Sequence, residues 1–125
     1  MAIDTNVLLR LLAHDDAAQA PAADQAIAKG AWVSHLVLAE AIWVLDAVYE
    51  RTPKQIIAAL DLLLIHDTLV LQDADVVAVA LGQFRAKPAL GFSDCLVRAI
   101  ARKAGHTPLA TFDKALAKLA GAQKL

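Results

Sequence analysis

The sequence predicts an α/β fold in which a central parallel sheet of four to five short strands is flanked by helices. Short apolar segments that suit buried strands alternate along the chain with longer segments of helical periodicity. Strands separated by helices pair in parallel, because the connecting helices cross over the sheet and cover its faces. The chain has 125 residues and neither an internal repeat nor a long linker, so we expect one domain over residues 1–125.

The first half of the chain is expected to begin with the end of a very short strand, Ala2–Ile3, directly before Asp4. Gly30 ends one of the helices that follow, as glycine often does. Thr52 and Pro53 open another, with a cap residue followed by proline at the first helical position. The expected elements are helices at 5–12, 16–29, 35–49 and 53–65, and a strand at 31–34.

The second half repeats the alternation of strand and helix. Gly105 closes a helix that Ser93 opens, and the apolar segment 108–111 after it suits a strand. Residues 122–125 are expected to begin a final, very short strand. The other expected elements are a strand at 69–71 and helices at 73–85 and 113–119.

The composition excludes several classes of protein. Apolar residues make up 58% of the chain and the mean hydropathy is +0.51, which excludes disorder and suggests that a partner covers some apolar surface. No uninterrupted apolar run approaches the roughly 20 residues that span a bilayer. The N-terminus lacks the pattern of a signal peptide, and the single cysteine, Cys95, allows no intrachain disulfide. We therefore expect a cytoplasmic protein without a membrane segment.

The charge distribution is uneven although the net charge is only −1. Residues 1–62 hold four basic and eight acidic residues, whereas residues 63–125 hold eight basic and five acidic ones. The later basic residues are either ordinary solvated helix faces, which charge alone favours, or groups that follow the phosphates of a nucleic acid. They include Arg85, Lys87, Arg98, Arg102, Lys103, Lys114 and Lys118.

Four acidic residues from distant segments are predicted to lie at one edge of the sheet. Asp4 follows the first strand and Asp113 follows the strand at 108–111. Asp94 opens one helix, and Glu40 lies in the second turn of another. Because helices that follow parallel strands begin at the carboxyl edge, all four acids should face the same side.

Each acid also has a structural interpretation. Asp4, Asp94 and Asp113 could cap helices or favour their first turns, and Asp94 could pair with Arg98 one turn later. Glu40 is different, since its neighbours at helical spacing are apolar: Leu36, Val37, Trp43 and Val44. Either that helix is rotated so that Glu40 reaches solvent, or a cation or polar groups meet it. Two carboxylates about 4 Å apart repel by roughly 4 kcal/mol at an effective dielectric near 20. Clustered oxygen ligands favour Mg²⁺ or Mn²⁺.

Four stretches of the sequence, in order, resemble the PIN-domain nucleases. They are DTNVLLRLL at the start, SHLVLAE, FSDCLVRAIARKAG, and LATFDKAL near the end. Among PIN domains the chain is most similar to the VapC-type toxins of toxin–antitoxin modules, although the segment before Asp4 is shorter than in that family. The resemblance implies a PIN-like three-layer sandwich. It also implies that Asp4, Glu40, Asp94 and Asp113 are the catalytic residues and the ligands of Mg²⁺ or Mn²⁺.

The resemblance further implies polar residues that support the site, and two kinds of protein partner. Thr5, Asn6 and Thr111 match the supporting positions. The implied partners are a second copy of the chain in a homodimer and a VapB-type antitoxin. Two consecutive apolar helices agree with either a dimer interface or a groove for an antitoxin helix, although much of their apolar surface must form the internal core.

The function expected from these observations is that of a metal-dependent endoribonuclease toxin that cleaves structured RNA. Two alternatives stay open. One is a PIN-domain nuclease that acts in RNA processing outside a toxin–antitoxin module. The other is a non-enzymatic α/β interaction module in which the acids only cap helices.

Overall fold

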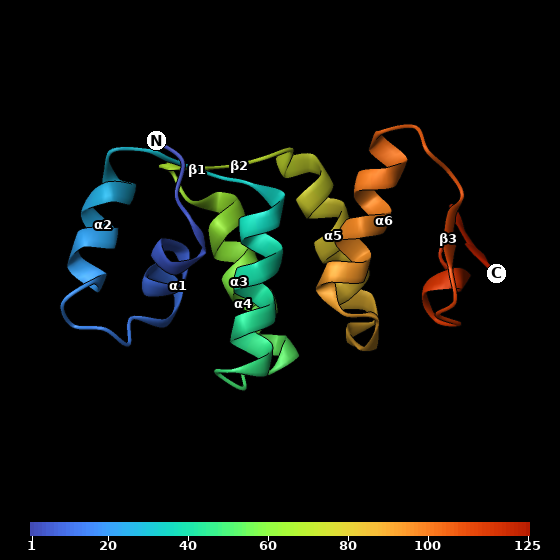
Figure 1. Ribbon diagram of the computed structural model, residues 1–125, viewed down its shortest axis with the longest axis horizontal. Helices are drawn as coiled ribbons and strands as arrows, with labels where there is room; N and C mark the ends of the chain where they lie inside the picture. The colour runs from blue at the N-terminus through green and yellow to red at the C-terminus, as the bar shows by residue number, and fades with distance from the viewer. The chain divides into compact units, whose positions relative to one another are not determined.

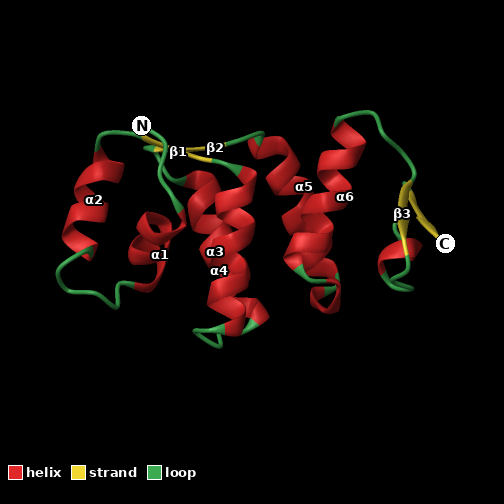
Figure 2. Ribbon diagram, in the orientation of Figure 1, coloured by secondary structure: helices red, strands yellow, loops and turns green.

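The computed structural model describes all of residues 1–125, and the chain divides into two compact units, Met1–Ala74 and Asp75–Leu125. Each unit combines helices with a pair of short parallel strands, which Figure 2 distinguishes by colour. The fold class is therefore α/β, as the sequence predicts. The predicted strands pair as two two-stranded parallel sheets, one in each unit.

The strands of the first unit are β1 (Ala31–Val33) and β2 (Leu69–Leu71). They pair in parallel, with Ala31 opposite Leu69. The predicted strand end before Asp4 is present as a single parallel bridge from Ala2 to Trp32. Both strands alternate buried, exposed and buried side chains, so one face of this small sheet lies against the helices of the unit.

Three helices of the first unit begin directly after a residue whose side chain accepts a hydrogen bond from an amide of the first turn. Ser34 caps one helix by accepting a hydrogen bond from the Val37 amide, and Thr52 forms a capping box with Gln55 before Pro53. Leu8, Leu38 and Leu60 are fully buried among these helices. The helices, seen in Figure 1, are α1 (Thr5–Ala13), α2 (Ala20–Ala28), α3 (His35–Ala47) and α4 (Pro53–Ile65).

The second unit pairs two further strands in parallel, with Leu109 opposite Ala122. Its core includes an edge-to-face contact between the rings of Phe84 and Phe92, whose centroids are 6.2 Å apart. The strand predicted at the end of the chain is present. The elements are α5 (Ala74–Ala86), the short 3₁₀ helix η1 (Pro88–Leu90), α6 (Phe92–Lys103), β3 (Leu109–Thr111), the 3₁₀ helix η2 (Leu116–Lys118) and β4 (Ala122–Lys124).

Two helix predictions are wrong in extent. The helix expected from residue 16 begins at Ala20, because the Asp16 carboxylate accepts hydrogen bonds from the Ala18 and Gln19 amides and holds a turn there. The helix expected at 113–119 is only the single 3₁₀ turn of η2, since the backbone becomes extended at Leu119. Both errors lie where side chains or turns near the helix ends compete with the helix. No helix is both long and apolar enough to cross a membrane.

Candidate functional site

The first unit contains two of the four predicted acids, Asp4 and Glu40, which we call the N-terminal acidic pair. Asp4 is the residue before α1, and its Oδ1 accepts a hydrogen bond of 3.0 Å from the Val7 amide. It therefore caps α1 and remains exposed to solvent. The cap fixes one carboxylate oxygen and leaves the other for a ligand.

Glu40 also reaches solvent, so the rotated-helix interpretation of its apolar neighbours is correct. The buried face of α3 consists of Leu38, Ala41, Ile42 and Leu45. Trp43, one turn after Glu40, is 61% exposed. Glu40 nevertheless meets a polar group, because its Oε2 accepts a hydrogen bond of 2.9 Å from the hydroxyl of Thr5. The predicted supporting residue Thr5 thus orients this carboxylate.

The second unit contains the other two acids, Asp94 and Asp113, which we call the C-terminal acidic pair. Asp94 lies in the first turn of α6, which starts after Gly91 with a φ of 79° that favours glycine. Asp113 follows β3, and its amide donates to the Thr111 hydroxyl at 3.0 Å. The Asp113 carboxylate accepts from the Leu116 amide at 2.8 Å, so Thr111 and the turn together hold it.

The electrostatic environment of Asp94 disfavours its charged form. Partial burial raises the pKa of Asp94, and the negative charge of Asp113 raises it further. The two carboxylates are thus close enough to interact, although Asp94 still reaches solvent. A nearby cation would favour the charged form of Asp94.

Arg98 does not pair with Asp94, although the spacing of the two residues suggested it. Its side chain is only 2% exposed, and its Nε donates a hydrogen bond of 2.8 Å to the carbonyl of Ala120. Its Nη1 is buried without a partner. Burial lowers the pKa of the guanidinium, and the charge of Arg102 lowers it further. Arg98 is therefore an internal residue that holds the turn before β4, and it is not part of a solvated basic face.

Other candidate residues have clear positions. Cys95 is fully buried, as expected for a core residue, and burial raises the pKa of its thiol. Asn6 is exposed and, together with Asp4, lines a pocket of about 350 Å³ whose walls also include Arg10 and Gln19. The sequence interpretation missed these last two residues because their spacing matches no motif.

Neither unit alone brings three histidine, cysteine or acidic side chains together as a metal site. The carboxylates of Asp4 and Asp113 each accept a hydrogen bond from a backbone amide, and that of Glu40 accepts one from the Thr5 hydroxyl. Carboxylate oxygens without nitrogen or sulfur ligands suit Mg²⁺ and Mn²⁺. The acidic pairs therefore consist of the type of ligand that these ions prefer.

The sequence profile of the PIN domain matches residues 1–122, so the chain belongs to the PIN-domain family. The match includes all four acidic residues and continues across the boundary between the two units. PIN domains are generally nucleases that act on RNA with the help of divalent metal ions. No curated protein matches the chain.

Proposed function

We propose that the protein is a Mg²⁺- or Mn²⁺-dependent endoribonuclease that cleaves structured RNA and leaves 5′-phosphate and 3′-hydroxyl ends. The observation that carries the proposal is the PIN-domain match over residues 1–122, which includes all four acidic residues. The charge of Asp113, which contributes to the raised pKa of Asp94, supports it. Perturbed carboxylates that repel each other are typical of sites that hold a cation.

In this proposal Asp4, Glu40, Asp94 and Asp113 are the metal ligands and the catalytic residues. A bound divalent ion lowers the pKa of water and stabilises negative charge on the phosphate oxygens. The Thr5 hydroxyl keeps Glu40 in one orientation, and Thr111 keeps the backbone of Asp113 in place. Without a cation, four carboxylates would repel the phosphates of RNA, so metal binding would also permit RNA binding.

We also propose that residues 1–125 work as a single nuclease domain. The support is the PIN-domain match, which continues past the boundary at Ala74 and Asp75. The acids of each unit make up only half of the expected set, so neither unit would bind metal and cleave RNA alone.

The more specific role that we propose is that of a VapC-type toxin in the cytoplasm, neutralised by a VapB-type antitoxin and active as a homodimer. The support is the four-motif resemblance together with apolar surface on the first unit. An open groove of about 900 Å³ there includes Leu11, Leu62 and Ile65 among its lining residues, and Leu62 and Ile65 are 63% and 75% exposed. Apolar grooves of this kind accept amphipathic helices. A gene for a small DNA-binding antitoxin directly upstream would favour the toxin over an RNA-processing nuclease.

The decisive experiment is incubation of the purified protein with total RNA and Mn²⁺, followed by mapping of new 5′ ends. The wild type should create defined ends, and Asp94→Asn should create none while its circular dichroism spectrum stays unchanged. Asp46→Asn is the control, because it removes an exposed carboxylate of α3 that belongs to neither acidic pair. Near-normal cleavage by Asp94→Asn would contradict the assignment.

The non-enzymatic alternative also has support, because Asp4 and Asp113 do accept backbone hydrogen bonds as capping residues. Capping alone, however, gives no reason for the hydrogen bond between Thr5 and Glu40. Titration with Mn²⁺ in a calorimeter separates the two interpretations. A nuclease site should bind Mn²⁺ measurably, whereas scattered caps should not.

A further inference from the structure

The pocket beside Asp4 lies on the first unit and is lined by residues of α1, of α2 and of the turn between them. Its volume is about 350 Å³, which is at the lower end of the range for sites that enclose a small ligand. The polar lining consists of Asp4, Asn6, Arg10 and Gln19, and alanines of α2 provide small apolar contacts. It is therefore a place where a ligand could contact a proposed catalytic carboxylate and a set of amide groups.

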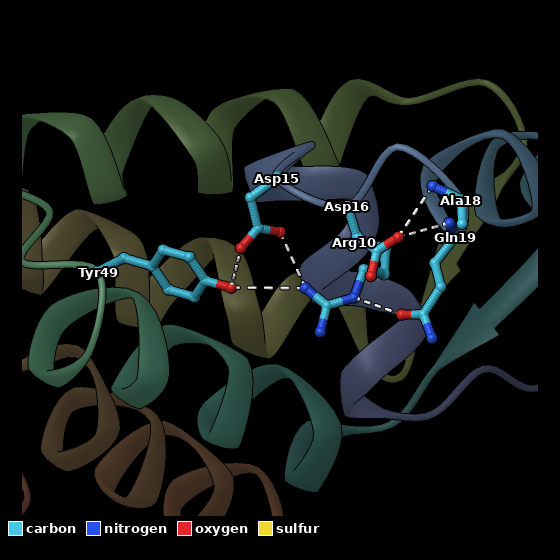
Figure 3. A network of polar contacts seen from close by, with 6 residues as sticks. All are labelled: Arg10, Asp15, Asp16, Ala18, Gln19 and Tyr49. Atoms are coloured by element: carbon cyan, nitrogen blue, oxygen red, sulfur yellow. Dashed lines mark hydrogen bonds and ion pairs between the residues drawn. The ribbon is translucent and has the colours of Figure 1, made fainter.

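Arg10 is held in this pocket by three neighbours, as Figure 3 shows. Its Nε donates to Oε1 of Gln19 at 2.7 Å, and its Nη1 donates to Oδ1 of Asp15 at 2.9 Å. The hydroxyl of Tyr49 lies 3.5 Å from the same Nη1 and donates to Oδ2 of Asp15 at 2.6 Å. The network joins α1, the segment before α2 and the turn after α3, so the guanidinium has one fixed position.

The network also determines which ligand the pocket suits. The charge of Arg10 has a partner, because its Nη1 lies 2.9 Å from Oδ1 of Asp15. The hydrogen bond from Tyr49, together with the charge and hydrogen bond of Arg10, lowers the pKa of Asp15. Asp4 adds a further negative charge to the pocket. A phosphate group would therefore find little net attraction. A neutral, flat group with hydrogen-bonding edges fits better, since amides bind base edges and guanidinium planes stack on bases.

We propose that this pocket binds the base of one RNA nucleotide next to the phosphodiester bond that is hydrolysed at the acidic residues. This inference rests on the proposed function. Gln19 is fixed at its Oε1 by Arg10, which leaves its amide group to donate to the base. Asn6 offers a second amide at the pocket wall. Asp15 and Tyr49 do not line the pocket, so they act as positioning residues through Arg10. The pocket would thus give the enzyme a base preference at one position of the RNA.

The test uses the full chain and titrates the four nucleoside 5′-monophosphates and inorganic phosphate as probes. Binding is followed by chemical-shift changes in ¹⁵N-resolved NMR spectra. At least one nucleotide should shift the signals of Gln19 and Ala22, and inorganic phosphate should not. Gln19→Ala should weaken nucleotide binding about 5-fold to 10-fold, the loss expected for one hydrogen bond. Tyr49→Phe should weaken it less, because it removes only the hydroxyl that supports Asp15.

Gln25→Ala is the matched control, because Gln25 is exposed on the same helix but does not line the pocket. Equal weakening by the Gln19 and Gln25 variants would overturn the proposal. So would shifts caused equally by inorganic phosphate, or no shifts with any nucleotide.

RNA cleavage provides the second measurement and separates this proposal from the nuclease assignment. In the wild-type background, Gln19→Ala and Tyr49→Phe should raise KM and relax the base preference at one position, with kcat nearly unchanged. Unchanged KM and preference in an active enzyme would overturn the pocket proposal alone. Nucleotide binding that depends on Gln19 in a protein that cleaves no RNA would support a base-binding pocket and contradict the nuclease function.

Discussion

The two acidic pairs differ in how the protein compensates their charge. In the N-terminal acidic pair, Asp4 caps α1 and Glu40 accepts a hydrogen bond from the hydroxyl of Thr5. In the C-terminal acidic pair, burial and the charge of Asp113 raise the pKa of Asp94. The same unit also buries Arg98 with one nitrogen unpartnered. The first pair is thus oriented by neutral donors, whereas the second carries repulsion that a cation would relieve.

The largest effect is expected from Asp113→Asn, which removes half of the C-terminal acidic pair. Cleavage of RNA under single-turnover conditions should fall on the order of 10³-fold, because a proposed metal ligand is lost. The pKa of Asp94, measured by NMR, should also fall, since a neighbouring negative charge is gone. A variant that cleaves normally, or an unchanged pKa of Asp94, would show that the two carboxylates do not act as a pair.

The next effect concerns the hydrogen bond that orients Glu40. Thr5→Val removes the hydroxyl but keeps the shape of the side chain, so Glu40 loses its donor. Partners that orient metal ligands are typically worth about 10-fold to 100-fold in metal affinity or activity. We expect a loss of that size in Mn²⁺ affinity and cleavage. Thr68→Val, which removes a hydroxyl outside both pairs, should have no such effect, and equal losses in the two variants would contradict the role of Thr5.

A smaller effect, on stability, is expected at Arg98. Arg98→Met removes a buried charge, and the single hydrogen bond to Ala120 does not offset the cost of desolvating that charge. Methionine keeps much of the packing. The free energy of unfolding in urea should rise by about 1–2 kcal/mol. Arg102→Met, at an exposed position of the same helix, should change it by less than about 0.5 kcal/mol. Destabilisation by Arg98→Met would mean that the contact with Ala120 outweighs the burial of charge.

The smallest effect is the pH dependence of stability caused by Asp94. Its pKa is higher in the folded than in the unfolded chain, so the folded state binds the proton more tightly. Stability therefore falls as the pH rises from the ordinary to the raised pKa, and the loss persists above that window. Asp94→Asn should be more stable than the wild type at neutral pH by less than about 1 kcal/mol, because solvent screens this group. Thermal unfolding should show the difference shrinking in acid, and a difference independent of pH would contradict it.

Much of the fold could be predicted from the sequence because its signals are local. Thr52, Pro53 and Gln55 together specify the start of α4, and short apolar segments between polar turns specify β1, β2 and β3. The start of α2 could not be predicted, since it depends on hydrogen bonds from backbone amides to Asp16. The short extent of the helix predicted at 113–119 could not be foreseen for a similar reason. The backbone becomes extended at Leu119, where the chain leaves η2 for β4.

The candidate site was less predictable, because its details depend on tertiary contacts. Helix α3 is apolar on nearly every face, so periodicity could not show that Glu40 lies at its exposed side. The spacing of Asp94 and Arg98 suggested an ion pair, yet Arg98 reaches Ala120, 22 residues later. The network of Arg10, Asp15 and Tyr49 joins residues up to 39 positions apart and has no local signature.

The central proposal is that Asp4, Glu40, Asp94 and Asp113 serve one divalent-metal site. The most direct test is calorimetric titration of Mn²⁺ into the wild type, Asp4→Asn, Asp94→Asn and the double variant. If the acids share the metal, each single variant loses most of the affinity and the double variant loses little more. Full wild-type affinity in either single variant, or strictly additive losses, would contradict a shared metal site.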